Sequence, residues 1–256
     1  MNILGIIQAR MSSTRLTGKV LLDLEGRTVV EHVIKRVRSA EMIEDVIVAT
    51  TIEKVDKKIV EICKNIGIKS FCGSEEDVLD RFYQAAKLFN PEHIVRITAD
   101  CPLIDPKVID KVIKLHLKEK ADYTTNTLKE TFPDGEDVEI FTFEALSKAW
   151  QDAKILSERE HVTPYIKKHQ DIFKIRNLEC YQNLSNKRWT IDNPEDYLFL
   201  KVIFKNLFLK NNLFGIEEIL EFLNKNPNVE IINQHINRNE GYSKSLKNDK
   251  VKRIYG

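Results

Sequence analysis

A short connection near the start of the chain, Gln8–Lys19, combines three cations with a run of hydroxyl side chains. Arginine can bind phosphate oxygens through two parallel hydrogen bonds, lysine supplies a point charge, and hydroxyls and free backbone N–H groups donate to the same oxygens. Gly18, one of only nine glycines in the chain, would let the backbone approach such a group closely. We interpret this connection, called the cationic loop below, as a phosphate-binding site; a solvated basic loop is the alternative. The loop residues that carry this interpretation are Arg10, Ser12, Ser13, Arg15, Gly18 and Lys19.

The loop matches neither common nucleotide-binding motif. The P-loop pattern G-x-x-x-x-G-K-[ST] would need glycine in place of Ser13 and a hydroxyl residue in place of Val20. The dinucleotide pattern G-x-G-x-x-G is absent from the sequence. A P-loop ATPase and a dehydrogenase are therefore disfavoured.

Two aspartates that follow expected strands are candidate metal ligands. Asp100 comes directly after a strand expected at His93–Thr98, and Asp192 follows one expected at Arg188–Ile191. Mg²⁺ in proteins usually takes one or two carboxylates, and carboxylates at strand ends can share one ion across a crevice. An Asx-turn before Pro102 is an equally weighted explanation of Asp100.

Other polar residues near these aspartates have structural explanations. Asp105, which precedes a proline, is expected to cap a helix. Asn193 with Asp196 three positions later predicts a capping box, which leaves Asp192 without a capping role. Arg96 lies inside an apolar strand, where a charge needs a partner, so we expect it to pair with a core carboxylate rather than face the site.

A third group could contact a polyhydroxylated ligand. Asp137 and Glu139 share one face of a strand expected around Val138–Phe141, where they could accept hydrogen bonds from sugar hydroxyls or support the metal. A solvated strand face is the competing explanation. His161 is a further candidate, although a lone histidine beside an apolar helix face more often packs than reacts. Ser157, with a glutamate three positions later, predicts a capping box for that helix.

Composition fits one large α/β domain that needs no disulfides. The chain has 256 residues, of which 42% are hydrophobic, enough to bury about three quarters of the unfolded surface. A net charge of +1 provides no overall attraction for nucleic acid or anionic membranes, so we expect neither partner. The four cysteines form no C-x-x-C pair, and no apolar run is long enough for a signal peptide or a membrane span. We expect a cytoplasmic protein.

Apolar runs alternate with amphipathic segments over the first two thirds of the chain, as in parallel strands joined by crossover helices. This pattern predicts a doubly wound α/β sheet that binds ligands at the carboxyl ends of its strands. The expected strands are Ile3–Ala9, Asp45–Thr50, Lys69–Cys72 and His93–Thr98, and the expected helices are Val29–Val37, Val55–Ile66, one that follows a capping box at Ser74 and Asp77, and one from Pro106.

Beyond residue 120 the alternation is less regular. The segment Asn233–Gly256 has few apolar residues and six Lys and Arg against two Asp and Glu, which predicts a tail that is mobile or folded over another surface. Expected elements before it are strands at Ala121–Thr125, Val138–Phe141, Phe173–Leu178 and Arg188–Ile191, helices at Phe143–Ala153 and Glu158–His169, and two packed helices within Tyr197–Phe222.

Six segments in consistent order resemble the cytidylyltransferases of the spore coat polysaccharide biosynthesis protein F type, which are relatives of the CMP-Kdo and CMP-sialic acid synthetases. The resemblance covers about residues 1–200, and two departures are Thr17 where proline is usual and Ala99 where glycine is common. Neither departure removes a charged group. The six segments are the cationic loop and residues 73–81, 98–105, 133–141, 157–165 and 188–196.

The resemblance implies a nucleotide-binding three-layer α/β/α sandwich with a mostly parallel sheet, like that of nucleotide-diphospho-sugar transferases. It also implies Mg²⁺ as cofactor, CTP as donor and often a homodimer. The reaction would transfer CMP from CTP to an acidic or phosphorylated sugar, with release of pyrophosphate, for the synthesis of surface polysaccharides or glycans.

On this resemblance, each candidate residue receives a role. Arg10, Arg15 and Lys19 would be catalytic. Asp100 and Asp192 would hold the metal. The acceptor would be bound by Asp137, Glu139 and His161, and the nucleotide by Ala9, Arg10, Ser12, Ser13, Gly18, Lys19, Gly73, Asp80 and Arg81.

We expect residues 1–210 to form the nucleotidyltransferase domain, with about 120–185 supplying the acceptor site and a dimer contact. Residues 211–256 would add a helical extension and the basic tail. Two other functions stay open: a metal-dependent glycosyltransferase, disfavoured because no clear D-x-D follows a strand, and a non-catalytic nucleotide-binding module. The sequence leaves open the acceptor, the pathway, the oligomeric state and the choice of CTP over other nucleotides.

Overall fold

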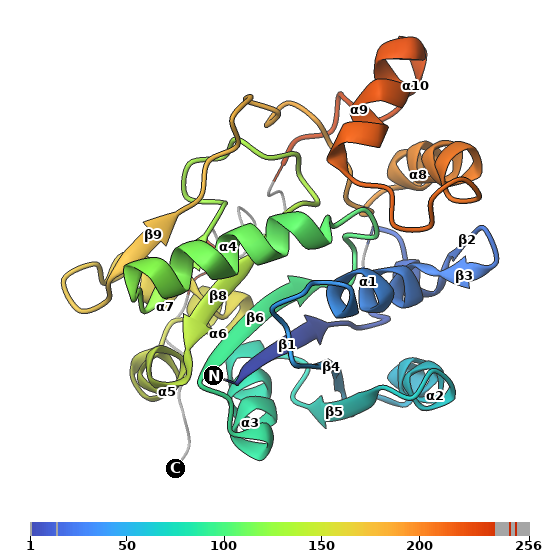
Figure 1. Cartoon of the computed structure of the whole chain (residues 1–256). Coiled ribbons are helices and arrows are strands. Elements are labelled where there is room, and N and C mark those ends of the chain that lie inside the picture. The colour runs from blue at the N-terminus through green and yellow to red at the C-terminus, as the bar shows by residue number, and fades with distance from the viewer. Residues whose placement is uncertain (1, 14, 239–245, 247–248, 250–256) are drawn as a thin grey trace.

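Among the described residues of the computed structural model, 2–13, 15–238, 246 and 249, seven strands form one sheet in the order β5-β4-β1-β6-β8-β7-β9 (Figure 1). Neighbours from β5 to β6 pair in parallel, β8 is antiparallel to both β6 and β7, and β9 is parallel to β7. The predicted mostly parallel sheet is confirmed. The strands are β1 (Ile3–Gln8), β4 (Asp45–Thr51), β5 (Lys69–Gly73), β6 (His93–Thr98), β7 (Tyr123–Thr125), β8 (Glu139–Thr142) and β9 (Ile175–Asn177), and a separate hairpin joins β2 (Asp23–Leu24) to β3 (Arg27–Thr28).

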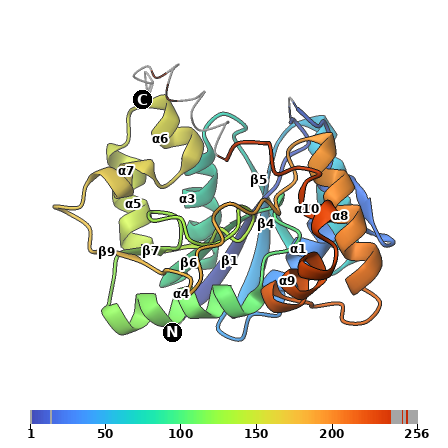
Figure 2. The ribbon, with the colours of Figure 1, turned by 90° about the horizontal axis from the view of Figure 1, so that it is seen from above.

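Helices cover both faces of the sheet and complete the predicted three-layer sandwich (Figures 1 and 2). One face packs Val33, Ile59 and Ile113 against the strands, and the other packs Phe82 and Leu146. The strands are apolar on both sides because both sides are covered. The first face carries α1 (Val29–Arg38), α2 (Lys57–Asn65) and α4 (Pro106–Glu119), and the second carries α3 (Val78–Phe89), α5 (Phe143–Asp152), α6 (Leu156–His161) and α7 (Pro164–Lys168).

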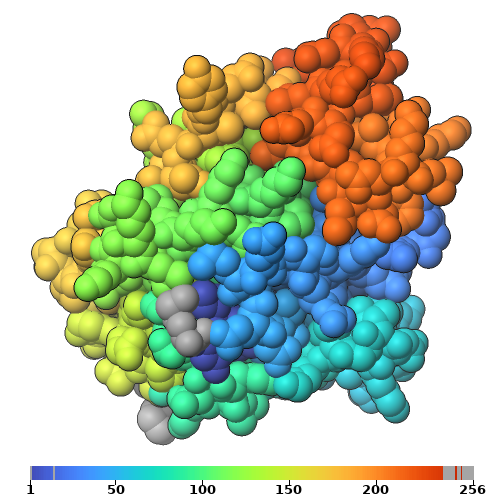
Figure 3. All heavy atoms as spheres, in the orientation of Figure 1, coloured from blue at the N-terminus to red at the C-terminus, as the bar shows by residue number. Residues whose placement is uncertain are grey.

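The C-terminal helices pack beside α1 at one corner of the molecule (Figure 3). They share an apolar core with the β2–β3 hairpin. This core contains Leu24 from the hairpin, Phe204 from α8 and Trp189. The two packed helices predicted within Tyr197–Phe222 are confirmed, and no helix of the described residues is long and apolar enough to cross a membrane. The helices of this corner are α8 (Pro194–Leu207), α9 (Ile216–Lys225) and α10 (Pro227–Glu230).

Predicted helix starts are confirmed where side chains cap them. Asp105 accepts a hydrogen bond from the Lys107 N–H at 2.8 Å and begins α4. Asn193 and Asp196 form the capping box of α8. At α3 the cap is Asp77 rather than the predicted Ser74, whose hydroxyl instead accepts from the Asp77 N–H at 3.0 Å.

Three predictions beyond α3 are wrong. The helix expected over Glu158–His169 is broken at Val162, where φ is +71°, so it forms α6 and α7. Ser157 does not cap α6 because it lies inside that helix and donates its N–H and hydroxyl to Asp249, at 2.9 and 2.8 Å. Arg188–Ile191 makes one isolated bridge instead of a strand, because its N–H groups donate to two different segments.

Two other predictions shift. A 3₁₀ turn, Lys54–Asp56, precedes α2, which starts later than the expected Val55. The described part of the predicted tail is folded over another surface, since the Asn233 amide donates to the Arg188 carbonyl at 3.0 Å. Residues 239–245, 247–248 and 250–256 of that tail lie outside the described residues.

Candidate functional site

The cationic loop leaves the carboxyl end of β1 and folds back on itself. The N–H groups of Ser13 and Gly18 both donate to the Met11 carbonyl, at 2.9 and 3.0 Å. Gly18 has φ +70°, a conformation that glycine adopts without strain, and it leads directly into the 3₁₀ turn that starts at Lys19. Asp56, which the sequence analysis missed, accepts from the Met11 N–H at 2.7 Å and holds the loop from the β4 side. No local pattern marks Asp56, because its partner lies 45 positions away.

Lys19 lies between the two predicted metal ligands. Its Nζ is 2.7 Å from Asp100 Oδ2 and 2.7 Å from Asp192 Oδ1, and Arg15 Nη2 is 2.8 Å from Asp192 Oδ2. Burial lowers the pKa of Lys19, but the two carboxylates outweigh it and the net shift is upward. Burial likewise raises the pKa of Asp100, and the Lys19 ammonium reverses this and brings it to about 2. The ionised forms of lysine and aspartate are therefore held together at neutral pH.

A buried network sets the position of Asp192. Arg188 donates to both carboxylate oxygens of Asp196, at 2.8 and 2.9 Å, and lies 3.5 Å from Asp192. Asp196, with no exposed surface, also accepts from the Asp192 N–H at 2.9 Å. Asp192 is thus fixed through its backbone by the capping box of α8.

A cavity of about 540 Å³, called the strand-end cavity below, opens beside these groups. It is lined by Arg15 and both aspartates, and also by the three predicted acceptor residues. The structure therefore brings residues of five sequence segments to one place, while their roles stay predictions. The lining residues are Arg15, Arg96, Thr98, Asp100, Cys101, Thr127, Leu128, Glu130, Asp134, Asp137, Glu139, His161, Thr163, Pro164, Lys167, Thr190 and Asp192.

Glu139 is the most strongly bound carboxylate of the cavity. It accepts from Tyr123 and Thr163 at 2.6 Å each and pairs with Lys167 at 3.0 Å and with Arg96. Burial raises its pKa, but Lys167 and Arg96 more than compensate, so the pKa lies below the ordinary value. The predicted pairing of Arg96 is confirmed, but Arg96 also lines the strand-end cavity, so the expectation that it would not face the site is wrong. A solvated strand face is wrong for Glu139, whose side chain is only 6% exposed.

The other acceptor candidates differ in their surroundings. His161 lies at the end of α6, its Nε2 is 3.8 Å from Glu160, and burial lowers its pKa, which favours the neutral imidazole. Asp137 is one third exposed, and Arg238 Nη2 lies 2.5 Å from its Oδ1. Sequence reasoning missed Arg238 as a cavity partner because it treated the tail as a separate segment.

Two of the predicted nucleotide-binding residues in the cationic loop contact the same carboxylate, Glu75. Arg10 Nη1 lies 3.9 Å from Glu75, and the Ser12 hydroxyl donates to the same carboxylate. Gly73 packs on Arg81, since a Cβ at this glycine would lie 3.0 Å from Arg81 Cγ. Arg81 is fully buried, and its Nε and Nη2 have no hydrogen-bond partner among the described residues.

The remaining two nucleotide candidates make structural contacts. Asp80 accepts from the Trp150 indole at 2.8 Å and from Gln84 at 3.1 Å, which ties α3 to α5. The Ala9 N–H donates to the Ala49 carbonyl at 3.1 Å. Their assignment to the nucleotide stays a prediction.

The donor set of Asp100 and Asp192 fits Mg²⁺. Both carboxylates already converge on one cationic atom, Nζ of Lys19. The part of the chain that the structure describes holds no cluster of three or more His, Cys, Asp or Glu side chains that could cage a metal. Mg²⁺ does not need such a cage, because it commonly takes one or two carboxylates and completes its shell with water and phosphate oxygens.

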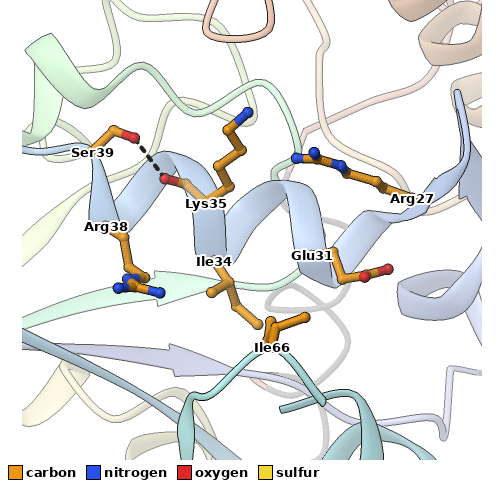
Figure 4. Close-up of a pocket in the computed structure, with 7 residues that line it drawn as sticks. All are labelled: Arg27, Glu31, Ile34, Lys35, Arg38, Ser39 and Ile66. Atoms are coloured by element: carbon orange, nitrogen blue, oxygen red, sulfur yellow. Dashed lines mark hydrogen bonds between the residues drawn. The ribbon is translucent and has the colours of Figure 1, made fainter. Parts of the chain in front are cut away.

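A second cavity, of about 580 Å³, lies along α1 and is also lined by Ile66, which directly follows α2 (Figure 4). Figure 4 shows side chains of α1 that point in different directions, and the one dashed bond joins Ser39 to the Lys35 carbonyl. No predicted site residue is among those that line it: Arg27, Glu31, Ile34, Lys35, Arg38, Ser39 and Ile66. The strand-end cavity is therefore the better candidate.

A family profile, curated relatives and a solved structure all relate this chain to cytidylyltransferases. The sequence profile of the family described as Cytidylyltransferase matches residues 4–240. The spore coat polysaccharide biosynthesis protein SpsF of Bacillus subtilis is 33% identical over 89% of this chain and 96% of its own. A 3-deoxy-manno-octulosonate cytidylyltransferase of Geotalea daltonii is 30% identical over 72% of this chain and 73% of its own. The solved structure of a cytidylyltransferase from Leptospira borgpetersenii is 37% identical, has a TM-score of 0.87 and covers 93% of this chain and 100% of its own.

Proposed function

We propose that this chain, which belongs to the cytidylyltransferase family, transfers CMP from CTP to an acidic or phosphorylated sugar and releases pyrophosphate. The observation that carries the proposal is the convergence of Lys19, Asp100 and Asp192 beside the strand-end cavity. The name of the Geotalea relative, which specifies cytidylyl transfer to a keto-acid sugar, supports the choice of donor and of acceptor class.

The cationic loop would hold the triphosphate. Arg15 and Lys19, which pair with Asp192, would offset charge on the leaving pyrophosphate, and Arg10, which lies 3.9 Å from Glu75, would extend this cationic surface. The hydroxyls of Ser12 and Ser13 and the backbone at Gly18, Ala9 and Gly73 would approach the nucleotide. Arg81 has buried donor groups that could meet acceptor atoms of a base, while Asp80 would border that pocket.

Asp100 and Asp192 would hold Mg²⁺, which when bound supplies positive charge to the phosphate oxygens. The acceptor would lie in the strand-end cavity against Asp137, Glu139 and His161. There its nucleophilic oxygen would attack the α-phosphorus of CTP in line with the leaving pyrophosphate. Because the protein forms no covalent bond in this scheme, positioning and charge neutralisation provide the rate enhancement.

The product would serve polysaccharide synthesis, as the name of the Bacillus relative suggests for that protein. The protein would act in the cytoplasm, where its four unpaired cysteines would stay reduced. A homodimer would form through residues 120–185, where the described surface exposes Leu128, Ile172 and Tyr181. Residues 1–210 would form the catalytic domain and 211–256 its extension.

The test is a pyrophosphate-release screen that crosses four nucleoside triphosphates with acidic and phosphorylated sugars, with and without Mg²⁺. We expect turnover with CTP, and a loss of about 10²–10³-fold in Lys19→Ala. Lys69→Ala is the matched control, because Lys69 also pairs with an aspartate, at 2.8 Å, but is 64% exposed. Release from a finished nucleotide-sugar would favour a glycosyltransferase, and CTP binding without any turnover would favour a non-catalytic module.

A further inference from the structure

The segment Asn233–Arg238 brings a cation from the C-terminal part of the chain to carboxylates that line the strand-end cavity. Arg238 Nη2 lies 2.5 Å from Asp137 Oδ1, and its Nη1 donates to the Phe132 carbonyl at 3.1 Å. Its Nε is 3.5 Å from Glu130 and 3.9 Å from Asp134. These three carboxylates all line the cavity. Arg238 has no role in the transfer of CMP as proposed.

The position of Arg238 is fixed by the network that also fixes Asp192. Asn233 is buried, and its amide donates to the Arg188 carbonyl at 3.0 Å and to Asp196 at 2.9 Å. Arg188 in turn donates to the Asn237 carbonyl at 3.4 Å. The Arg238 side chain is only 12% exposed, and it contacts these carboxylates from a backbone that the network holds in place.

The lining of the strand-end cavity contains two chemically different groups of charged side chains. Around Glu139, the cations Arg96 and Lys167 share a single carboxylate, which leaves positive charge available to an anionic group. Around Arg238, several carboxylates share a guanidinium, with Arg188 also pairing with Asp134 at 2.8 Å. Carboxylates held in this way are hydrogen-bond acceptors, and the groups that suit them are sugar hydroxyls.

We propose that Arg238 is a positioning residue that sets acceptor specificity: by holding Asp137, Asp134 and Glu130, it builds a subsite for the hydroxyl-bearing end of a sugar acid. This inference rests on the proposed function. In this subsite the anionic group of the acceptor would face Arg96 and Lys167. The polyol chain of the acceptor would face the carboxylates that Arg238 holds.

The probes are 3-deoxy-manno-octulosonate and a six-carbon 2-keto-3-deoxy sugar acid that lacks its two terminal hydroxyl-bearing carbons. Steady-state kinetics are measured on the full chain for Arg238→Gln, Arg238→Lys and Lys129→Gln. Lys129 is the control, because it adjoins Glu130 but is 70% exposed and pairs with Glu179. We expect Arg238→Gln to raise the KM of the longer acid about tenfold, the change produced by losing one charge-assisted contact set. The KM values of CTP and of the shorter acid should change less than about twofold.

The KM of Arg238→Lys for the longer acid should lie between the values of the wild type and Arg238→Gln, because lysine keeps the charge but not the planar set of donors. Asp137→Asn should raise the same KM, and adding it to Arg238→Gln should have little further effect, because the two groups act as one unit. Thermal unfolding shows whether each variant is folded.

Equal losses with both acids, a fall in kcat alone, or unchanged kinetics in Arg238→Gln would overturn the inference while the proposed function stands. If the wild type turned over neither acid nor any other sugar of the screen, the proposed function itself would fail and this inference with it.

Discussion

Glu139 is a carboxylate that the fold can bury because two hydroxyl groups and two cations contact it. Tyr123, Thr163 and Lys167 contact one oxygen, and Arg96 contacts the other. Sequence reasoning identified Glu139 and the need of Arg96 for a partner, since both follow from strand alternation and from an isolated charge. It could not identify Lys167 or Tyr123, because nothing local marks residues that meet a carboxylate only in the folded chain.

The charge of Glu139 makes a testable contribution to stability. Because its folded pKa lies below the unfolded value of about 4.3, this contribution is complete above that pH and is lost as the pH falls through the folded value. We expect Glu139→Gln to lower the free energy of unfolding by about 3 kcal/mol at neutral pH, since two cations lose their partner. The difference from wild type should shrink progressively as the pH falls below about 4.3. Urea titrations at several pH values measure it, with Asp45→Asn in an exposed pair as control. A difference that stayed constant with pH would refute the explanation.

Strand ends and helix caps decide where the site forms. The parallel strands β1 and β6 lie in register, so the cationic loop and Asp100 leave the sheet at the same edge. This much was predictable, because apolar runs and caps are local signals. The helix break at Val162 and the irregular backbone of Arg188–Ile191 could not be predicted, because tertiary contacts override the local pattern at both places. These two segments supply part of the lining of the strand-end cavity, so that part could be identified only from the structure.

Asp77 joins two helices, and its loss should cost more than an ordinary cap. It accepts from the Asp80 N–H at 3.0 Å and from Arg159 Nε and Nη2 at 3.0 and 2.8 Å. The Arg159 side chain is 5% exposed, so Asp77→Ala would leave a buried charge without this partner. We expect a loss of about 3 kcal/mol, against about 1 kcal/mol for Thr142→Ala, a cap without an ion pair. Chemical denaturation compares the two, and equal losses would show that the ion pair between α3 and α6 adds nothing.

The site is assembled from nearly the whole length of the chain. Lys19 and Asp192 are 173 positions apart, and Arg238 comes from the segment after α10. The core around Trp189 and the cores on the two faces of the sheet must all form before these groups meet. A ligand that binds them should therefore stabilise the folded molecule as a whole.

Thermal unfolding with nucleotide tests this coupling. Ligand at 100 times its Kd stabilises the folded state by about 2.7 kcal/mol, which in a domain of this size raises Tm by about 5–10 °C. We expect that rise with CTP and Mg²⁺, and a rise below about 2 °C in Asp100→Asn, which lacks one of the two proposed metal ligands. Lys35→Gln, in the cavity along α1 shown in Figure 4, should keep the full shift. If Lys35→Gln lost the shift while Asp100→Asn kept it, the nucleotide would bind in the cavity along α1 and not in the strand-end cavity.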